Sequence, residues 1–218
     1  MNQLLCPICN SNSISLLYHW KKLNRDYYKC SECDFVFLDP KQRLNITDEK
    51  IQYNLHNNDV SDQGYCHFLQ QLIDPLKQYL IPKDDYRNGI DYGCGPNPTL
   101  SLLIEKEGIT MDVYDPIYFP KTTDVGRKYD LVTCSEVIEH FYNPTTDFKK
   151  MINLLRPNGL LAVLTDFYLE DRDFPTWHYI RNSTHVCFYS PKNLTLLAKN
   201  NNLQVFLHGN RVAIFRLA

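Results

Sequence analysis

Two glycines at alternate positions in one turn, Gly93 and Gly95, constrain the fold of this chain more than any other feature. They follow a strand-like run that contains Asp91, and a helix-like stretch over residues 99–107 comes next. Alternate glycines let the backbone turn tightly at the carboxyl end of a strand and approach a ligand closely. A plain strand–helix connection is the alternative, because two glycines in a turn are by themselves a weak signal. The pattern indicates an α/β sheet whose ligand-binding edge carries this turn.

A second acidic residue gives the turn a more specific meaning. Asp115 closes another strand-like run 20 residues beyond Gly95, the separation at which an acidic side chain binds a ribose diol. Asp91, Gly93, Gly95 and Asp115 resemble the motifs of class I S-adenosylmethionine-dependent methyltransferases. Asn97 stands where a dinucleotide fingerprint has its third glycine, which argues against a nicotinamide enzyme because a pyrophosphate needs the fuller glycine loop.

The resemblance covers roughly residues 65–218. Apolar residues at helical spacing over residues 64–80 match the helix that precedes the first strand of such a core. Residues 129–144 resemble the fourth-strand motif, and residues 154–165 match its helix end, turn and central strand. The resemblance implies a Rossmann-like methyltransferase sheet that binds S-adenosylmethionine through Asp91, Gly93, Gly95, Asp115 and Glu136.

The region after Asp115 is unusually short. Only 13 residues, 116–128, separate it from the next buried strand, where a full core of this family has room for a helix and a strand. We therefore expect a sheet shortened around its third strand. Asp124 is the one acidic candidate there for a contact near the adenine ring.

Four of the eight cysteines form two C-x-x-C pairs, Cys6 with Cys9 and Cys30 with Cys33. Two such pairs separated by 20 residues offer four thiolates to one tetrahedral Zn²⁺. Disulfides are the alternative, which a cytosolic chain disfavours, and His19 is an alternative metal ligand. A segment this short cannot build an apolar core, so the metal would supply its folding free energy.

We predict a zinc ribbon over residues 1–40 and a linker over residues 41–64. The ribbon is similar to the one fused ahead of many bacterial small-molecule and sugar methyltransferases. Its aromatic residues, among them Tyr18 and Tyr27, alternate with lysine and arginine, a mixture that also suits nucleic acid. Residues 1–50 hold seven basic against six acidic residues, which makes that alternative weaker.

The whole chain carries a formal net charge of -2, which provides no basic field for nucleic acid or anionic lipid. The first residues lack the layout of a signal peptide, and no apolar run approaches the roughly 18 residues that span a bilayer. We expect a cytoplasmic protein without a membrane partner. The sequence carries no signal for an oligomeric state.

Methyl transfer from a sulfonium is an in-line displacement, so the enzyme mainly positions the acceptor. A hydroxyl acceptor also gains from a base or a metal that lowers its pKa. We predict His185 as the base, with His140 and Glu139 as further catalytic candidates and His178 as an alternative. His185 lies in the aromatic-rich segment 177–190, where the family places its substrate-covering insert.

Glu136, Glu139 and His140, with the later His185, form a pattern similar to the E-x-x-E-H constellation of ubiquinone-type O-methyltransferases and of small-RNA terminal 2′-O-methyltransferases. Those enzymes hold a divalent ion there. On one helical turn the first three residues would share a face, and the set suits Mg²⁺, Mn²⁺ or Fe²⁺. The alternative, which we favour, is helix capping and cofactor contact without a second metal.

The resemblance implies a small-molecule acceptor, and we expect O-methylation of a sugar or related metabolite. Two alternatives stay open: an RNA methyltransferase that docks through the ribbon, and a non-catalytic binding protein with a decayed core. Tyr53, His56 and Tyr65 match residues that close over the cofactor's amino-acid end in related enzymes, with ordinary linker contacts as the alternative.

Overall fold

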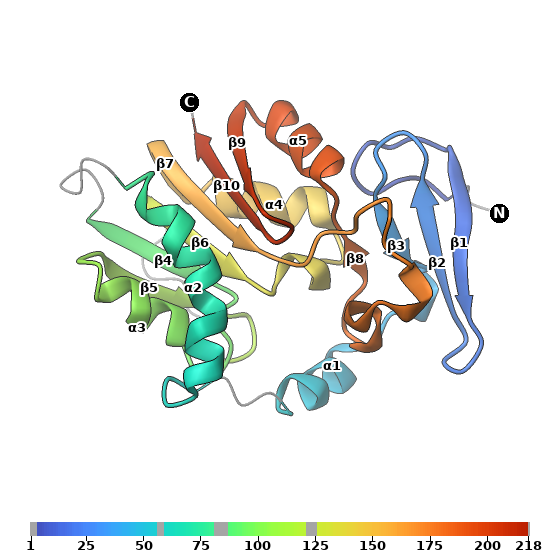
Figure 1. Ribbon diagram of the computed structural model, residues 1–218, viewed down its shortest axis with the longest axis horizontal. Coiled ribbons are helices and arrows are strands. Elements are labelled where there is room, and N and C mark those ends of the chain that lie inside the picture. Colours follow the sequence, from blue (N-terminus) through green and yellow to red (C-terminus); the bar gives the residue numbers. More distant parts are fainter. Residues whose placement is uncertain (1–3, 56–58, 81–86, 121–125, 218) are drawn as a thin grey trace.

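The computed structural model describes residues 4–55, 59–80, 87–120 and 126–217, which form a mixed sheet with helices on both faces and a smaller sheet beside it (Figure 1). The large sheet has the strand order β5-β4-β6-β7-β10-β9. β5, β4, β6 and β7 are parallel, and β10 is antiparallel to β7 and β9. The strands are β4 (Asn88–Tyr92), β5 (Thr110–Tyr114), β6 (Tyr129–Ser135), β7 (Leu155–Leu164), β9 (Leu203–His208) and β10 (Val212–Leu217). The predicted α/β class is confirmed.

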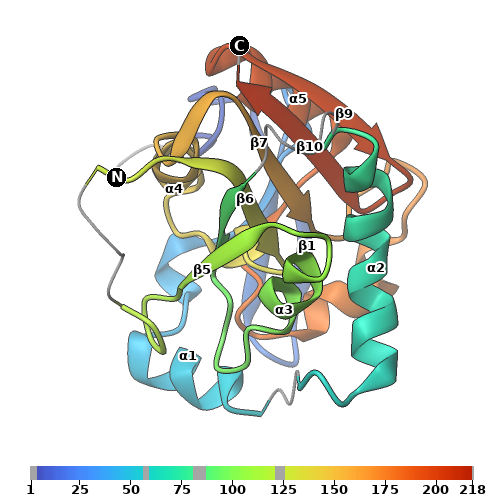
Figure 2. The same ribbon diagram turned by 90° about the vertical axis from the view of Figure 1, so that its left-hand side faces the viewer.

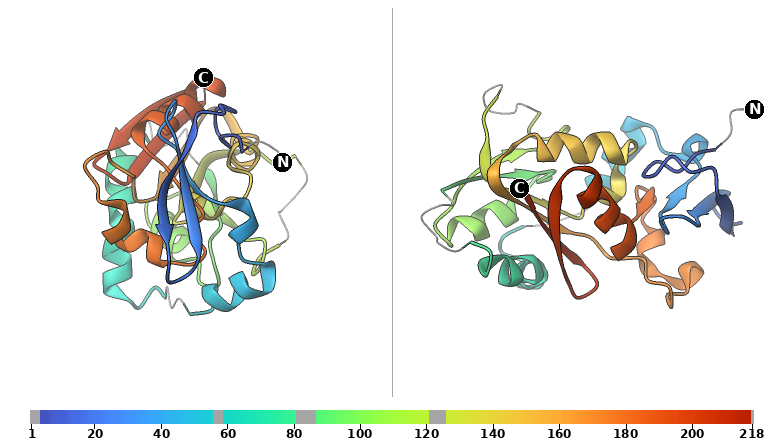
Figure 3. Two further views of the ribbon diagram at one scale, coloured as in Figure 1. Left: turned by 90° about the vertical axis from the view of Figure 1, so that its right-hand side faces the viewer. Right: turned by 90° about the horizontal axis from the view of Figure 1, so that it is seen from above.

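Two pairs of helices cover the two faces of this sheet (Figures 2 and 3). Side chains alternate across a strand, so Leu160, Ala162 and Leu164 of β7 pack with one helix pair, while Leu161 and Val163 pack with the other. The first pair is α2 (Gln63–Lys77) and α3 (Thr99–Glu105), and the second is α4 (Pro144–Ile152) and α5 (Pro191–Asn200). Each strand of the centre is therefore buried on both sides.

The order of the large sheet agrees with the predicted shortening. Among the described residues no strand lies between β5 and β6 in the chain, so β5 forms one edge of the sheet. The only ladder contact of the segment after β5, within its described part, is the isolated bridge between Asp115 and Phe119. Asp124 lies outside the described residues.

The segment 154–165 differs from the expected helix end, turn and strand. β7 begins at Leu155, which pairs with Tyr129, so the Pro-Asn-Gly sequence lies inside the strand. Asn158 adopts a φ of 62°, and the pairing with β6 shifts its register at this place. The turn residues produce an irregularity in the ladder because the chain on both sides of them bonds to β6.

The smaller sheet has the strand order β1-β2-β3-β8, with every neighbouring pair antiparallel. Its strands are β1 (Ile14–Trp20), β2 (Arg25–Cys30), β3 (Val36–Leu38) and β8 (Cys187–Phe188). The β1–β2 hairpin connects the two cysteine pairs of the expected ribbon. β8 comes from the chain between β7 and α5, so the core contributes a strand to the ribbon sheet (Figure 1).

Hydrophobic packing also joins the ribbon to the core. Tyr27, Phe35 and Phe37 of the ribbon are fully buried in the same cluster as Phe148 of α4 and Leu194 of α5. The aromatic residues of this small sheet are therefore a continuation of the core on one face of the large sheet.

A short 3₁₀ helix, η1 (Pro40–Gln42), lies at the junction between the expected ribbon and the expected linker, and the helix α1 (Ile46–Tyr53) lies inside the linker. Asn45 caps α1, because its side chain accepts a hydrogen bond from the Asp48 amide at 3.0 Å. The Tyr118 hydroxyl, beyond β5, donates to the Asn54 side chain at 2.6 Å and ties α1 to the large sheet. Across the part of the chain that is described, no helix is both long and apolar enough to cross a bilayer.

Candidate active site

A cavity of about 1030 Å³ opens at the carboxyl ends of β4, β5 and β6. One half is lined by the glycine turn after β4 and by Asp115. The other half is lined by α1, by the chain after β6, and by residues of the 178–185 segment. The large-sheet edge that the sequence predicts as the binding edge therefore carries the cavity.

The glycine turn has the backbone that only glycine adopts readily. Gly93 has a φ of 80°, its amide donates to the Tyr114 carbonyl at 2.7 Å, and a Cβ here would lie 2.6 Å from both γ-carbons of Val137. Gly95 has a φ of 66°, and its amide donates to the Asp115 carboxylate at 3.1 Å. Any side chain at Gly93 would clash with Val137, which lies in the chain directly after β6.

Asp91 is a buried group that ties the glycine turn to its neighbours. Its carboxylate accepts hydrogen bonds from Thr133 of β6 at 2.8 Å and from Ser101 of α3 at 3.3 Å. Burial raises the pKa of this carboxyl to about 6. Asp91 lines the cavity, but these bonds show that it also fixes β4, β6 and α3 relative to one another.

Asp115 holds the loop after β5. One carboxylate oxygen accepts from the amides of Ile117 at 2.8 Å and Tyr118 at 3.0 Å, and the other accepts from Gly95. A carboxylate offers about four lone-pair sites, so three accepted bonds leave capacity for a ligand hydroxyl. Asp115 therefore lies at the edge of the large sheet that carries the cavity, where the sequence predicts it, and it also fixes the loop after β5.

The chain after β6 does not form the helical turn that the sequence analysis expects. Glu136 has a φ of 54°, in the left-handed region, and only then does a 3₁₀ turn, η3 (Ile138–His140), begin. Glu136, Glu139 and His140 therefore do not share a helical face, which corrects that expectation. The Glu136 atom Oε1 is buried without a hydrogen-bond partner among the described residues, and burial raises the pKa of this carboxyl well above its usual range.

Glu139 lies at the centre of a buried hydrogen-bond network. Its side chain is fully buried and accepts from the Tyr179 hydroxyl at 2.5 Å and from the Thr165 hydroxyl at 3.0 Å. The two hydroxyl oxygens are 3.0 Å apart, so either hydroxyl can donate to the other in place of its bond to Glu139. Burial raises the pKa of Glu139 to about 7, against the opposing effect of these donors.

The two candidate histidines meet beside Glu139. The His140 atom Nδ1 donates to the Thr184 carbonyl at 3.0 Å, and its ring centre lies 4.8 Å from that of His185. The His185 atom Nε2 is 3.9 Å from a Glu139 oxygen. Glu139, His140 and His185 each offer one ligand atom within 4.8 Å of the others, and Glu136 is outside this group.

The remaining sequence candidates lie around this centre. His178 is 65% exposed at the cavity edge and 3.9 Å from Asp166, away from the Glu139 group. Tyr53 packs edge-on against His140 with 5.3 Å between ring centres, and Tyr65 lines the cavity. His56 lies outside the described residues.

Three contributors were missed by the sequence analysis. Thr165 and Tyr179 are 26 and 40 residues from Glu139 in the chain, and no local pattern links them to it. Arg211 lines the cavity and donates to the buried Asp166 at 3.3 Å. Thr165 ends the motif segment 154–165, and Tyr179 lies in the aromatic-rich segment 177–190. Membership of these segments is the one signal in the sequence that could have suggested them.

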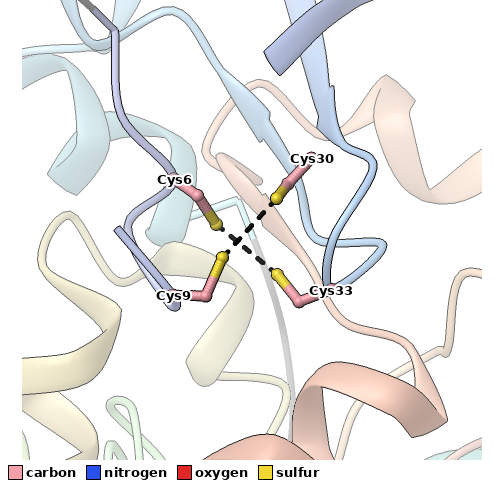
Figure 4. A group of neighbouring side chains, drawn as sticks. All are labelled: Cys6, Cys9, Cys30 and Cys33. Atoms are coloured by element: carbon pink, nitrogen blue, oxygen red, sulfur yellow. Dashed lines mark hydrogen bonds between the residues drawn. The ribbon is translucent and has the colours of Figure 1, made fainter. Parts of the chain in front are cut away.

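The four paired cysteines form a second candidate centre, in the ribbon. Figure 4 shows their sulfur atoms directed toward one another, with 3.5 Å between Cys6 and Cys33 and 3.6 Å between Cys9 and Cys30. Four sulfurs at 2.3 Å from one tetrahedral zinc would be about 3.8 Å apart, close to these distances. The sulfurs are too far apart for disulfides, which need about 2.05 Å.

The backbone of the two cysteine pairs explains this geometry. Asn10 and Asp34, each directly after the second cysteine of a pair, both have a φ of 59°. Their amides donate to the carbonyls of Cys6 and Cys30, each at 2.9 Å. Because the two turns are alike, each presents its two thiols on one side, and the set fits Zn²⁺. His19 instead bonds Asp26 at 2.6 Å and is not part of the cluster.

A family model described as "Methyltransferase domain" matches residues 65–208, more than half of the chain. The chain belongs to this family. The methyltransferase-domain match begins in α2 and ends in β9, so it contains the whole of the glycine turn, Asp115 and the Glu139 group. The family expected from the sequence is confirmed.

Two curated relatives of this methyltransferase domain carry the name ubiquinone biosynthesis O-methyltransferase. The one from Histophilus somni (strain 2336) is 31% identical over 94 residues, which are 41% of this chain and 37% of the relative. The one from Aeromonas salmonicida (strain A449) is 24% identical over 90 residues, 41% of this chain and 38% of the relative. The match thus spans less than two fifths of the relatives' length.

Solved structures show the same fold. The magnesium protoporphyrin IX methyltransferase of Synechocystis PCC 6803 with bound SAH has a TM-score of 0.52 at 15% identity, covering 81% of this chain and 89% of that one. An O-methyltransferase family protein from Burkholderia thailandensis has a TM-score of 0.50 at 14% identity, covering 72% and 61%. The Rossmann-like methyltransferase sheet is thereby confirmed for this methyltransferase domain.

Proposed function

We propose that this chain transfers a methyl group from S-adenosylmethionine to a hydroxyl of a small molecule, with a sugar or related metabolite as the acceptor. The observation that carries the proposal is one cavity that joins the glycine turn and Asp115 at one end to His140 and His185 at the other. The buried Glu139 lies behind this end, with a carboxylate oxygen 3.9 Å from His185 Nε2. About 1030 Å³ is at the upper end of the range for small-molecule sites and leaves room for two ligands side by side.

In this proposal the two halves of the cavity have different tasks. When bound, S-adenosylmethionine supplies an electrophilic methyl group. Asp115 accepts hydrogen bonds from its ribose, and Asp91, Gly93, Gly95 and Glu136 complete the cofactor half. The aromatic side chains of the other half, Tyr53, Phe141, Tyr142 and Tyr179 among them, would hold the acceptor and exclude water.

His185 would take the proton of the acceptor hydroxyl as its oxygen attacks. Its ring lies against Tyr179, with 4.1 Å between ring centres, and beside the Glu139 carboxyl. Glu139 is itself fixed by Tyr179 and Thr165, so it can orient the imidazole and stabilise the charge that forms on it. His140 forms the adjoining wall.

Zinc at the four cysteines is part of the proposal, as a structural metal. A closed set of four thiolates leaves no position for a substrate, so the site would contribute folding free energy alone.

A second metal at Glu139, His140 and His185 is the alternative mechanism, and a chelator distinguishes the two. We expect methyl transfer to survive a chelator that leaves the ribbon zinc bound, because Glu139 already accepts two hydrogen bonds and Glu136 is outside the group. Activity lost to the chelator and recovered with Mg²⁺, at constant zinc content, would establish the metal mechanism.

The metal-free mechanism also predicts a pH dependence. The rate of methyl transfer should rise with pH through about 7, since burial holds Glu139 protonated below that value.

A second prediction concerns the role of Asp115 in binding the cofactor. Replacing Asp115 by alanine should weaken S-adenosylhomocysteine at least about tenfold, because a charged acceptor contributes roughly 1.5–3 kcal/mol per bond and about 1.4 kcal/mol corresponds to a factor of ten. The Asp112→Ala variant removes an acid from β5, the strand that ends just before Asp115, away from the cavity, and serves as the control. Calorimetry that finds equal affinity in both variants would refute the ribose role.

The acceptor can be sought directly with a labelled methyl donor and a fractionated metabolite extract. We expect label in a low-molecular-weight fraction that depends on the protein. Label in the RNA fraction would establish the RNA alternative, against which stands the full burial of the ribbon's Tyr27 in the shared core. No label together with no S-adenosylhomocysteine binding would establish a non-catalytic protein.

A further inference from the structure

The ribbon touches the chain that carries His185. β3 pairs with β8, and the Leu38 amide donates to the Val186 carbonyl at 2.9 Å. Arg25, at the start of β2, is buried and donates from Nη2 to the Ser183 carbonyl at 2.8 Å. The ribbon therefore holds this segment, residues 182–188, on both sides of His185.

The core holds the same segment from its other side. The Val186 amide donates to the Glu139 carbonyl at 2.9 Å, and the Thr184 carbonyl accepts from the His140 ring. The Cys187 thiol donates to the Phe141 carbonyl at 3.1 Å. Segment 182–188 thus lies between the ribbon and the turn that carries Glu139 and His140.

The cavity lining shows which half depends on this arrangement. Within the described part of the ribbon, residues 4–40, no residue lines the cavity, whereas Asn182 and His185 of the segment do. The cofactor half comes from the ends of β4 and β5, which the ribbon sheet does not pair with. Segment 182–188 is therefore a direct link between the ribbon and the acceptor half of the cavity.

We propose that Arg25 is a positioning residue for methyl transfer, because its bond to Ser183 fixes the positions of the cavity residues Asn182 and His185. In this way the ribbon stabilises the acceptor half of the cavity. The inference rests on the proposed function for the meaning of the two halves. Arg25 and Ser183 are 158 residues apart in the chain, and the buried Arg25 side chain donates to the carbonyl of the half-buried Ser183. A charged donor to such a carbonyl is worth more than a neutral one.

The test compares full-length Arg25→Ala and Arg25→Lys with Lys22→Ala, which removes an exposed cation from the β1–β2 turn. Hydrogen exchange of the Val186 and Leu38 amides should be at least about tenfold faster in Arg25→Ala, from the loss of roughly 1.5 kcal/mol or more. Arg25→Lys, which keeps one donor, should restore part of this protection. Exchange in β4 and β5, zinc content and S-adenosylhomocysteine affinity should match wild type within about twofold.

A kinetic measurement separates positioning from plain destabilisation. With the acceptor fraction that takes up label, Arg25→Ala should raise the half-saturating amount of acceptor about tenfold and leave the KM for S-adenosylmethionine unchanged. A loss of folded protein alone would lower the maximal rate, but it would change neither the half-saturating amount of acceptor nor the KM for S-adenosylmethionine. Unchanged exchange in segment 182–188, or equal acceleration in β4 and β5, would overturn the proposal. A wild-type protein that binds no S-adenosylhomocysteine would instead count against the proposed function, while the exchange result still decides this inference.

Discussion

Replacing His185 by alanine should lower the rate of methyl transfer by about 10²–10⁴-fold, the usual contribution of a positioned acid or base. The reason is that His185 is the buried imidazole at the acceptor half of the cavity and is held between Glu139 and Tyr179. The affinity for S-adenosylhomocysteine should stay within about twofold of wild type, because the glycine turn and Asp115, and not His185, form the cofactor half of the cavity. The measurement is a single-turnover assay with labelled methyl donor and the acceptor fraction.

The matched control is His178→Ala. His178 lines the same cavity but is 65% exposed at its edge, so its loss should change the rate far less than the loss of His185. Glu139→Gln should fall between the two, since the amide keeps the size of the side chain and loses the charge that orients His185. Equal rates in His185→Ala and His178→Ala would contradict the assignment of the base.

The second large effect concerns the ribbon metal. Purified protein should contain about one zinc per chain, and Cys30→Ser should lose it, because a closed tetrahedral site needs all four thiolates. Structural zinc in small zinc-finger peptides contributes an apparent ~10–16 kcal/mol to folding. Since Phe35 and Phe37 are buried in one cluster with the core helices, loss of the metal should lower the melting temperature of the whole protein.

Elemental analysis and thermal unfolding check this prediction. Cys66→Ser is the control, because Cys66 lies on α2, outside the cysteine cluster, and its removal should leave both zinc and melting temperature near wild type. Wild-type protein without zinc, or a Cys30→Ser variant with full zinc content, would show that the four cysteines do not form the site.

Local patterns determined much of this protein. The tight turn needs a positive φ at both Gly93 and Gly95. Since glycine adopts a positive φ readily, the two alternate glycines in the sequence predict the turn. The two C-x-x-C pairs likewise predict a cluster of four thiols, since each pair forms its own small turn. The place of Asp115 follows because it comes directly after β5, and neighbouring parallel strands such as β4 and β5 end at the same edge of a sheet. These features require only what residues near one another in sequence decide.

Only the tertiary structure decided how the acceptor half is built. The sequence expected Glu136 on a helical face with Glu139, but the left-handed backbone at Glu136 directs it elsewhere. Thr165 and Tyr179 reach Glu139 from distant segments, and Arg25 reaches Ser183 across 158 residues. Such contacts depend on which buried faces pack together and on each buried polar group finding a partner, and neither requirement leaves a periodic mark in the sequence.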